Sequence, residues 1–359
     1  MEKANNVSRR NFLKQTSLGL GAGLVGPYPA LATGQVADLQ RLPSEICVAG
    51  IDLLELRPET TREARIKRVL ARMEQIAGLR PDVICLPELF DSMWVSGKET
   101  LPEMAEPENT PGPVTSRIAA FAKKHACYVV CPLLTKSEGH YYNSSLLLDR
   151  KGTIAGVYHK THVVKSEMLP DQDYRGGVVT PGALRQPVMT TDFGKVGVQI
   201  CYDANWPDGW DNLRQQGAAV IFFPSAFPGG RMLNYYAQRN NCYLVSATGG
   251  DARIVDMSGN DLDASSTFVR YAWALINLEK VTVTTWPTRD RLPDIFRQYG
   301  DRLKIKVWDN TGLITMESRD PQLKVRQVLR EFDIPTYAEL ISRETSLQDK
   351  HRPKMAANK

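Results

Sequence analysis

Short apolar runs alternate with amphipathic segments along most of the chain, and this alternation predicts a layered α/β fold. The apolar runs that we expect to form strands span residues 45–53, 82–86, 128–134, 195–200, 218–223 and 243–247. The segments with helical periodicity lie between them, at residues 61–79, 113–125, 208–216 and 231–241. Strand and helix therefore follow one another regularly, as is typical of the α/β class.

Two further segments predict antiparallel hairpins. Residues 143–149 and 153–158 flank a turn that ends at Gly152, and a glycine at that point favours a tight connection. Residues 253–257 and 268–278 are expected to pair around the turn Ser-Gly-Asn that starts at Ser258. The chain has no internal repeat and no low-complexity linker, which is consistent with a compact folded protein.

The N-terminal segment has the features of an export signal. Residues 8–14 read Ser-Arg-Arg-Asn-Phe-Leu-Lys, a weakly apolar stretch follows at residues 16–25, and Ala-Leu-Ala at residues 30–32 suits cleavage. We expect residues 1–32 to be a twin-arginine (Tat) signal peptide, with the Tat export machinery as a partner and a periplasmic or secreted location. The alternative is a disordered basic tail. No later run approaches the roughly 18 apolar residues of a spanning helix, so we expect no stable membrane insertion.

Composition excludes several other classes of function. The 359 residues are 42% hydrophobic and 24% charged, as in an ordinary globular protein, and the net charge is +5. No basic run with interleaved aromatic residues occurs, so nucleic acid is not an expected partner. The six cysteines lie mostly in apolar runs, where we expect free thiols and no disulfide framework. His125, Cys127 and Cys131 lack a matching fourth ligand, and we expect no metal.

Three reactive side chains follow β-rich apolar runs. Glu88 follows residues 83–87, Lys160 follows residues 156–159, and Cys201 follows residues 196–200. Each alone has an ordinary explanation, as a solvated carboxylate, a solvated surface amine or a buried thiol. Together, at one edge of a sheet, they provide a base, an oxyanion stabiliser and a nucleophile. We expect the backbone N–H of Tyr202 to contribute to oxyanion binding.

The motifs around these residues resemble those of the nitrilase (carbon-nitrogen hydrolase) superfamily. The resemblance runs from about Ile46 to Trp286 and rests on Leu-Pro-Glu ending at Glu88, Tyr-x-Lys-x-His around Lys160, and Cys-Tyr-Asp starting at Cys201. The sequence departs from the family pattern outside these three positions. Trp206 stands where Phe is usual, Asp208 where Glu is usual, and Arg239 where Glu is usual in a later helix.

The resemblance implies a four-layer αββα sandwich formed by residues 33–286. Residues 287–359 are then a C-terminal extension rather than a domain, placed at a subunit interface of a homodimer or higher homo-oligomer. A second glutamate often positions the substrate in this family, and Glu167 is the candidate, with Asp171 as the alternative. The resemblance implies structural roles for Asn143 and His162, and it implies no cofactor.

The expected function is hydrolysis of a non-peptide carbon–nitrogen bond in a small-molecule amide or N-carbamoyl substrate. Glu88, Lys160 and Cys201 would act through a covalent thioester and release ammonia or an amine. The alternatives are a nitrilase that acts on a nitrile and a non-catalytic binding protein on the same fold. The pocket is expected between the loops at residues 91–112 and 225–230, with apolar walls from Trp94, Trp206 and Phe227.

Overall fold

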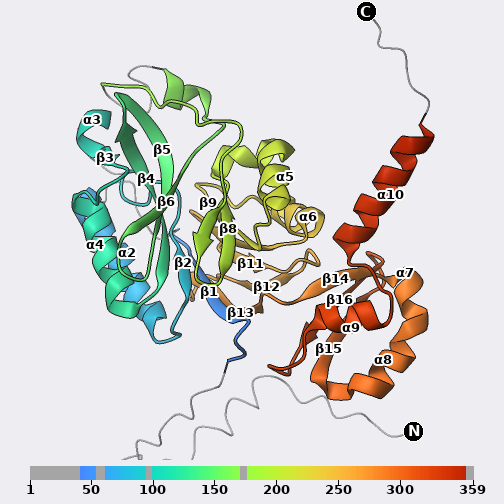
Figure 1. Cartoon of the computed structure of the whole chain (residues 1–359). Helices are drawn as coiled ribbons and strands as arrows, with labels where there is room; N and C mark the ends of the chain where they lie inside the picture. Colours follow the sequence, from blue (N-terminus) through green and yellow to red (C-terminus); the bar gives the residue numbers. More distant parts are fainter. Residues whose placement is uncertain (1–40, 54–60, 94–98, 170–175, 353–359) are drawn as a thin grey trace, which may run out of the picture. The chain divides into compact units, whose positions relative to one another are not determined.

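The computed structural model describes residues 41–53, 61–93, 99–169 and 176–352. Within these ranges, two β-sheets pack face to face and helices cover the outer face of each sheet (Figure 1). This order of layers confirms the predicted α/β sandwich. The layers matter for function because the segments that follow their strands meet at one edge.

The first sheet has the strand order β13-β1-β2-β4-β5-β6, and β3 pairs with β4 beside this path. Strands β1, β2 and β4 are parallel, and the other pairs, except β3 with β4, are antiparallel. The strands are β1 (Glu45–Ile51), β2 (Val83–Cys85), β3 (Glu106–Pro107), β4 (Tyr128–Ser137), β5 (His140–Leu148), β6 (Ile154–His159) and β13 (Tyr271–Asn277).

The second sheet has the order β12-β11-β10-β9-β8-β7, with β8, β9 and β10 parallel. Its strands are β7 (Met189–Thr191), β8 (Gly194–Val198), β9 (Val220–Pro224), β10 (Tyr243–Ala247), β11 (Arg253–Val255) and β12 (Asp261–Ala264). A parallel bridge between Asp52 and Thr248 joins the residues that follow β1 and β10. The carboxyl ends of the parallel strands of both sheets are therefore at the same edge of the sandwich.

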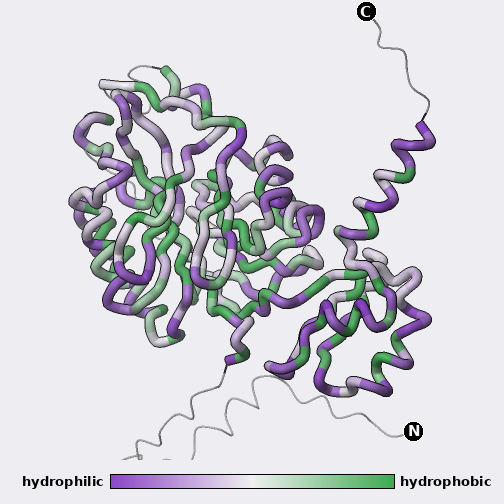
Figure 2. The backbone as a smooth tube through the Cα atoms, viewed as in Figure 1, coloured by the Kyte–Doolittle hydropathy of each residue, from purple (hydrophilic) through white to green (hydrophobic). Residues whose placement is uncertain are grey.

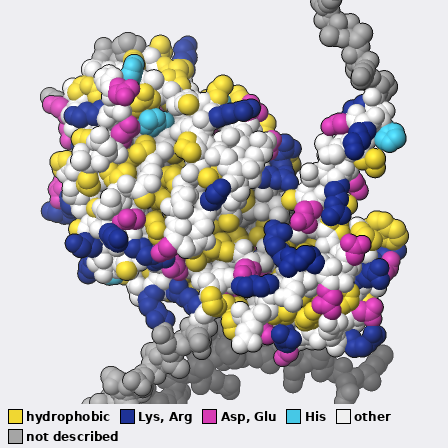
Figure 3. Space-filling model, viewed as in Figure 1, with side chains coloured by type: hydrophobic (Ala, Val, Ile, Leu, Met, Phe, Trp, Pro, Cys, Tyr) yellow, Lys and Arg dark blue, Asp and Glu magenta, His cyan; other side chains and the backbone are white. Residues whose placement is uncertain are grey.

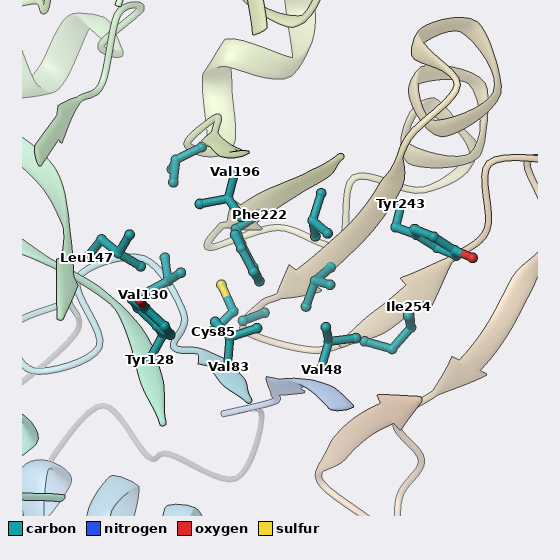
Figure 4. Packing of buried hydrophobic residues seen from close by; sticks show 14 of the residues in the cluster. Val48, Val83, Cys85, Tyr128, Val130, Leu147, Val196, Phe222, Tyr243 and Ile254 are labelled. Atoms are coloured by element: carbon teal, nitrogen blue, oxygen red, sulfur yellow. The ribbon is translucent and has the colours of Figure 1, made fainter. Parts of the chain in front are cut away.

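The period-2 alternation along the strands divides the apolar side chains between two layers. On β1, Val48 packs between the two sheets with residues such as Phe222 (Figure 4), whereas Ala49 and Ile51 pack toward the helices. Helices α2 (Arg62–Ala77) and α4 (Pro113–His125) cover the first sheet, and α5 (Pro207–Gln215) and α6 (Arg231–Asn240) cover the second. The hydrophobic residues accordingly concentrate in the strands and on the inner faces of these helices (Figure 2).

Helix α2 shows how the local sequence produces these elements. The Thr61 hydroxyl caps its N-terminus by accepting a hydrogen bond from the N–H of Ala64. Ile66, Val69 and Met73 are buried on one face, at the spacing of a helix that packs on a sheet. The amphipathic pattern predicted this helix within two residues at each end.

Two sequence expectations about strand pairing and loops are wrong. Strand β11 pairs with β12 across the Ser-Gly-Asn turn, whereas β13 leaves that sheet and pairs with β1 of the other. The loop expected at residues 91–112 contains the short helix α3 (Leu101–Met104) and strand β3. Buried Glu106 accounts for this local order, because its carboxylate accepts hydrogen bonds from the N–H groups of Val114 and Thr115 and so caps α4.

The C-terminal part contains a three-stranded sheet that the sequence did not predict. Its order is β14-β16-β15, with β14 (Val281–Thr284), β15 (Leu303–Trp308) and β16 (Leu313–Ser318). One face packs on its own apolar cluster, with α8 (Leu292–Tyr299) and α9 (Val325–Glu331). Short helical segments are α7 (Thr285–Thr288), η3 (Arg289–Arg291) and η4 (Gly300–Arg302). The expected boundary at residue 286 lies within α7, whereas β14, which pairs with β16, already belongs to this sheet.

The last helix, α10 (Tyr337–His351), begins at a capping box formed by Thr336 and Glu339 and contains no buried residue. On the visible face, basic and acidic side chains are interspersed over the C-terminal part (Figure 3), in keeping with ion pairs such as Lys304–Glu317. No helix within the described ranges is long and apolar enough to cross a membrane. The expected export signal at residues 1–32 lies outside the described residues.

Candidate active site

Glu88 follows β2 and is buried at the edge where the two sheets meet. Its Oε1 accepts hydrogen bonds from Lys160 Nζ and Asn143 Nδ2, both at 2.9 Å. Its Oε2 accepts the backbone N–H of Ala226, which follows β9 of the other sheet, at 2.9 Å. The next residue, Leu89, has a φ of 46°, a left-handed conformation that is uncommon for a residue other than glycine. The carboxylate is therefore fixed by partners from both sheets.

Lys160 follows β6 and lies between two carboxylates. Its Nζ is 2.9 Å from Glu88 Oε1 and 2.8 Å from Glu167 Oε2, and its side chain is 2% exposed. Burial opposes the charged form, but the charges of Glu88 and then of Glu167 outweigh it and hold the pKa of Lys160 above its usual value. A permanent positive charge is thus present inside the site.

Cys201 lies at a sharp turn between β8 and the 3₁₀ helix η2 (Cys201–Asn205), with a φ of 48°. Asp203 fixes this turn from within. Its Oδ2 accepts the Ile200 N–H at 2.9 Å and the Tyr158 hydroxyl at 2.8 Å, and its Oδ1 accepts the His162 N–H at 2.7 Å. Because Tyr158 and His162 flank Lys160, the same carboxylate aligns the lysine segment with the cysteine turn.

The thiol of Cys201 is protonated in the resting protein at neutral pH. Burial raises its pKa to about 12, and the negative charge of Glu88 adds to this effect. Lys160 and the hydroxyl of Ser225 act in the opposite direction. A thiol with such a pKa attacks an electrophile only if a neighbouring base takes its proton, and Glu88 is the neighbouring carboxylate whose charge acts on it.

The structure brings together most of the side chains that the sequence singled out. Glu88, Lys160 and Glu167 form one buried ion-pair cluster, and Cys201 is close enough to interact with the first two. Tyr202 follows directly in η2, and its ring is exposed. Glu167 lies in the 3₁₀ helix η1 (Lys165–Met168), and its Oε2 also accepts the Val164 N–H. The alternative, Asp171, lies outside the described residues.

Asn143 belongs to the site, which the structural role assigned to it from sequence did not convey. It is buried on β5, and its Nδ2 donates to Glu88 Oε1 and to Glu167 Oε1, each at 2.9 Å. The signal that could have revealed it is the polar sequence Asn-Ser-Ser at residues 143–145, at the start of a predicted strand. His162 has a supporting position, with its ring stacked on Trp206 at 4.0 Å and Nδ1 3.1 Å from Asp203.

A cavity adjoins Glu88 on the side of β1 and β10. It is small, with a volume of about 20 Å³, and its lining is mostly apolar, with Glu88, Ser225 and Arg65 as polar members. The full lining is Leu53, Arg65, Pro87, Glu88, Leu89, Phe90, Met93, Ser225, Ala226 and Gly249. Of the expected apolar walls, Trp206 and Phe227 do not line this cavity, and Trp94 lies outside the described residues.

Neither a metal cluster nor a disulfide occurs among the residues that the structure describes. No group of three or more metal-ligating side chains is placed together there, and all six cysteines are free. Cys127 and Cys131 pack in the apolar layer between the first sheet and its helices, and His125 Nε2 is 3.1 Å from Glu74. These three residues serve packing and surface pairing in the described part of the chain.

Comparison with known proteins agrees with this architecture. Residues 47–284 match the family model described as carbon-nitrogen hydrolase. The chain is 28% identical over 206 residues to deaminated glutathione amidase of Mus musculus, covering 52% of this chain and 61% of that protein. It is 29% identical over 194 residues to N-carbamoylputrescine amidase of Solanum lycopersicum, covering 53% and 61%. The chain thus spans about three fifths of the length of these two relatives.

A solved structure shows the same fold. Nit3 of Saccharomyces cerevisiae, described as a member of branch 10 of the nitrilase superfamily, superimposes with a TM-score of 0.55 at 20% sequence identity. The match covers 72% of this chain and 96% of that one. The family model spans more than half of the chain and includes the segments of Glu88, Lys160 and Cys201. The chain therefore belongs to the carbon-nitrogen hydrolase family.

Proposed function

We propose that the protein hydrolyses a non-peptide carbon–nitrogen bond of a small-molecule amide or N-carbamoyl compound through a thioester on Cys201. The observation that carries this proposal is the buried cluster in which Lys160 bridges Glu88 and Glu167 beside the thiol. Such a cluster supplies a base and a fixed positive charge next to a nucleophile. The names of the two curated relatives, which describe amidases, support the same class of reaction.

The proposed reaction begins with attack of the Cys201 sulfur on the carbonyl carbon, while Glu88 takes the thiol proton. The carbonyl electron pair moves onto oxygen, where Lys160 and the backbone N–H of Tyr202 stabilise the negative charge. The tetrahedral intermediate expels ammonia or an amine, which receives the proton from Glu88. Water, activated by Glu88, then attacks the thioester, and the acid and the free thiol are released.

Ammonia or amine release by the full chain tests this proposal. The panel contains aliphatic amides, N-carbamoyl amines and nitriles, each with and without a carboxylate, because Arg65 gives the cavity wall a positive group. We expect release from an amide or N-carbamoyl compound and none from the Cys201→Ala variant. Release from nitriles alone would favour the nitrilase alternative. An inactive protein whose Cys201 also resists iodoacetamide would favour a binding protein.

We also propose that the protein is exported through the Tat machinery and acts as a homodimer or higher homo-oligomer. The arginine pair at residues 9–10 supports export. Helix α10 supports association, because it buries no residue and exposes Ile341 and Leu347, and a lone helix of this length is marginal in water. Light scattering that gives a monomer mass at micromolar concentration would contradict the assembly, and an unprocessed chain found only in the cytoplasm would contradict export.

A further inference from the structure

Asn143 holds both carboxylates of the site with a single amide group. Its two N–H bonds point to Glu88 Oε1 and Glu167 Oε1, at 2.9 Å each. These two carboxylates come from different segments, one after β2 and one in η1. Lys160 connects the same pair from another direction. The two glutamates are therefore linked twice, once by the charged amine of Lys160 and once by the neutral amide of Asn143.

The orientation of this amide is unfavourable for its own oxygen. Asn143 Oδ1 is buried and accepts no hydrogen bond from the described residues. The reverse orientation would place that oxygen against two carboxylate oxygens, so the amide keeps its nitrogen toward them. A buried polar atom left without a partner is destabilising, and such atoms are rare in folded proteins.

The contacts of Asn143 also distinguish the two oxygens of Glu88. Oε1 accepts two hydrogen bonds, from Lys160 and Asn143, whereas Oε2 accepts the Ala226 N–H. A carboxylate oxygen has about two lone-pair sites. Oε1 is thus saturated, and Oε2 retains one site for the proton of Cys201.

We propose that Asn143 is a positioning residue for the reaction, which directs proton transfer from Cys201 to Oε2 of Glu88. This inference rests on the proposed function. The S–H bond of Cys201 breaks as its sulfur bonds to the carbonyl carbon, the proton moves to Oε2, and the carbonyl electron pair moves to oxygen. The same proton then leaves with the nitrogen of the substrate. Asn143 takes no part in bond changes and keeps the carboxylate of Glu88 correctly oriented.

The variant Asn143→Ala removes the hydrogen bond that Nδ2 donates to Glu88 Oε1. A hydrogen bond donated to a carboxylate favours its charged form, so we expect the acid limb of the kcat/KM profile to move to higher pH in the variant. We expect kcat to fall by about 10²-fold with a smaller change in KM, because a misplaced base slows chemistry more than binding. Asn143→Ser, which keeps one donor, should fall between the wild type and Asn143→Ala.

Asn240→Ala is the matched control. Asn240 is also buried, donates one hydrogen bond through Nδ2 to the Tyr236 carbonyl, and has an Oδ1 without a partner among the described residues. It lies on α6, away from the charged cluster. We expect Asn240→Ala to lower the midpoint of thermal unfolding and to leave the acid limb in place.

The experiment measures the pH profile of kcat/KM for the full chain, together with the rate at which iodoacetamide alkylates Cys201. Alkylation of Cys201 needs no substrate. It therefore tests the effect of Asn143 on the thiol even if none of the tested compounds is hydrolysed, and failure of this inference can be told apart from failure of the proposed function. The positioning role is supported if the acid limb of the kcat/KM profile shifts in both Asn143→Ala and Asn143→Ser, but not in Asn240→Ala. An unshifted limb in folded Asn143 variants overturns it. If Asn143→Ala does not fold, the presence or absence of the shift in Asn143→Ser decides between these two outcomes.

Discussion

Replacing Lys160 by methionine removes the one cation of the buried cluster at nearly constant side-chain volume. The wild-type side chain makes two ion pairs, at 2.9 Å with Glu88 and 2.8 Å with Glu167, and all three groups are at most 4% exposed. Removing one partner of a buried pair costs about 3–5 kcal/mol, because the remaining charge is left without compensation. That loss is a large share of the roughly 5–15 kcal/mol that stabilises a typical protein.

The sign of the pH dependence follows from the raised pKa of Lys160. A cation whose pKa is raised on folding contributes stability that is fully present below its unfolded value, near 10.5, and is lost as the pH rises through the folded value. At pH 7 the wild-type protein therefore has the whole stabilising contribution of the Lys160 cation, and Lys160→Met loses all of it. In Lys160→Met, two neighbouring carboxylates share a site without a cation, and one takes up a proton as the pH falls. The stability deficit is thus expected to shrink toward pH 5.

Urea unfolding at several pH values measures this deficit, and ammonia release measures the loss of rate. We expect activity to fall by at least about 10³-fold, because the positive charge that stabilises the oxyanion is lost. Lys67→Met is the matched control, because Lys67 makes an exposed pair with Glu63 at 3.5 Å, and exposed ion pairs contribute little to stability. If Lys160→Met matches Lys67→Met in stability, or if its deficit grows at acid pH, the buried-cluster reasoning fails.

Three other predictions test the surroundings of the site. The alkylation rate of Cys201 keeps rising up to about pH 10, because burial and a neighbouring carboxylate raise the thiol pKa to about 12, and a plateau near pH 8 would contradict this. Asp203→Asn places an amide N–H donor against groups that themselves donate to Asp203, and we expect the free energy of unfolding in urea to fall by about 1.5–3 kcal/mol. Activity should fall more than stability, and unchanged activity would refute the alignment role of Asp203. Gly50→Ala brings a Cβ within 2.0 Å of the Ser246 carbonyl oxygen, between the sheets, and we expect a loss of about 1–3 kcal/mol or more. Gly78→Ala, with no atom within 4 Å of its new Cβ, is the control for that loss.

The sequence predicted the parts of the fold that depend on local pattern. The buried stripe of α2 and the helix start at Pro113 follow from spacing and from the preference of proline for the first turn. The three reactive residues were recognised because each follows an apolar run and lies in a short motif that resembles those of the nitrilase superfamily. Such local signals need only neighbouring residues, and they are strong in this chain.

Pairing between distant segments could not be derived in the same way. Strand β12 has the sequence Asp-Leu-Asp-Ala and little apolar character, so nothing marked it as the partner of β11. Strand β13 carries apolar residues on both faces, which fits either sheet, and only the packed structure shows its pairing with β1. The contacts of Asn143 with Glu88 and Glu167 also depend on segments that are distant in sequence.

The two sheets of the sandwich divide the chemistry between them. Glu88, Asn143 and Lys160 follow or lie on strands of the first sheet, whereas Cys201 and Ala226 follow strands of the second. Neither sheet alone carries a complete set of reacting groups, and the hydrogen bond from Ala226 to Glu88 forms only where they meet. Under the proposed function, recovery of hydrolysis during refolding is therefore a readout of sheet docking, which recovery of secondary structure does not report.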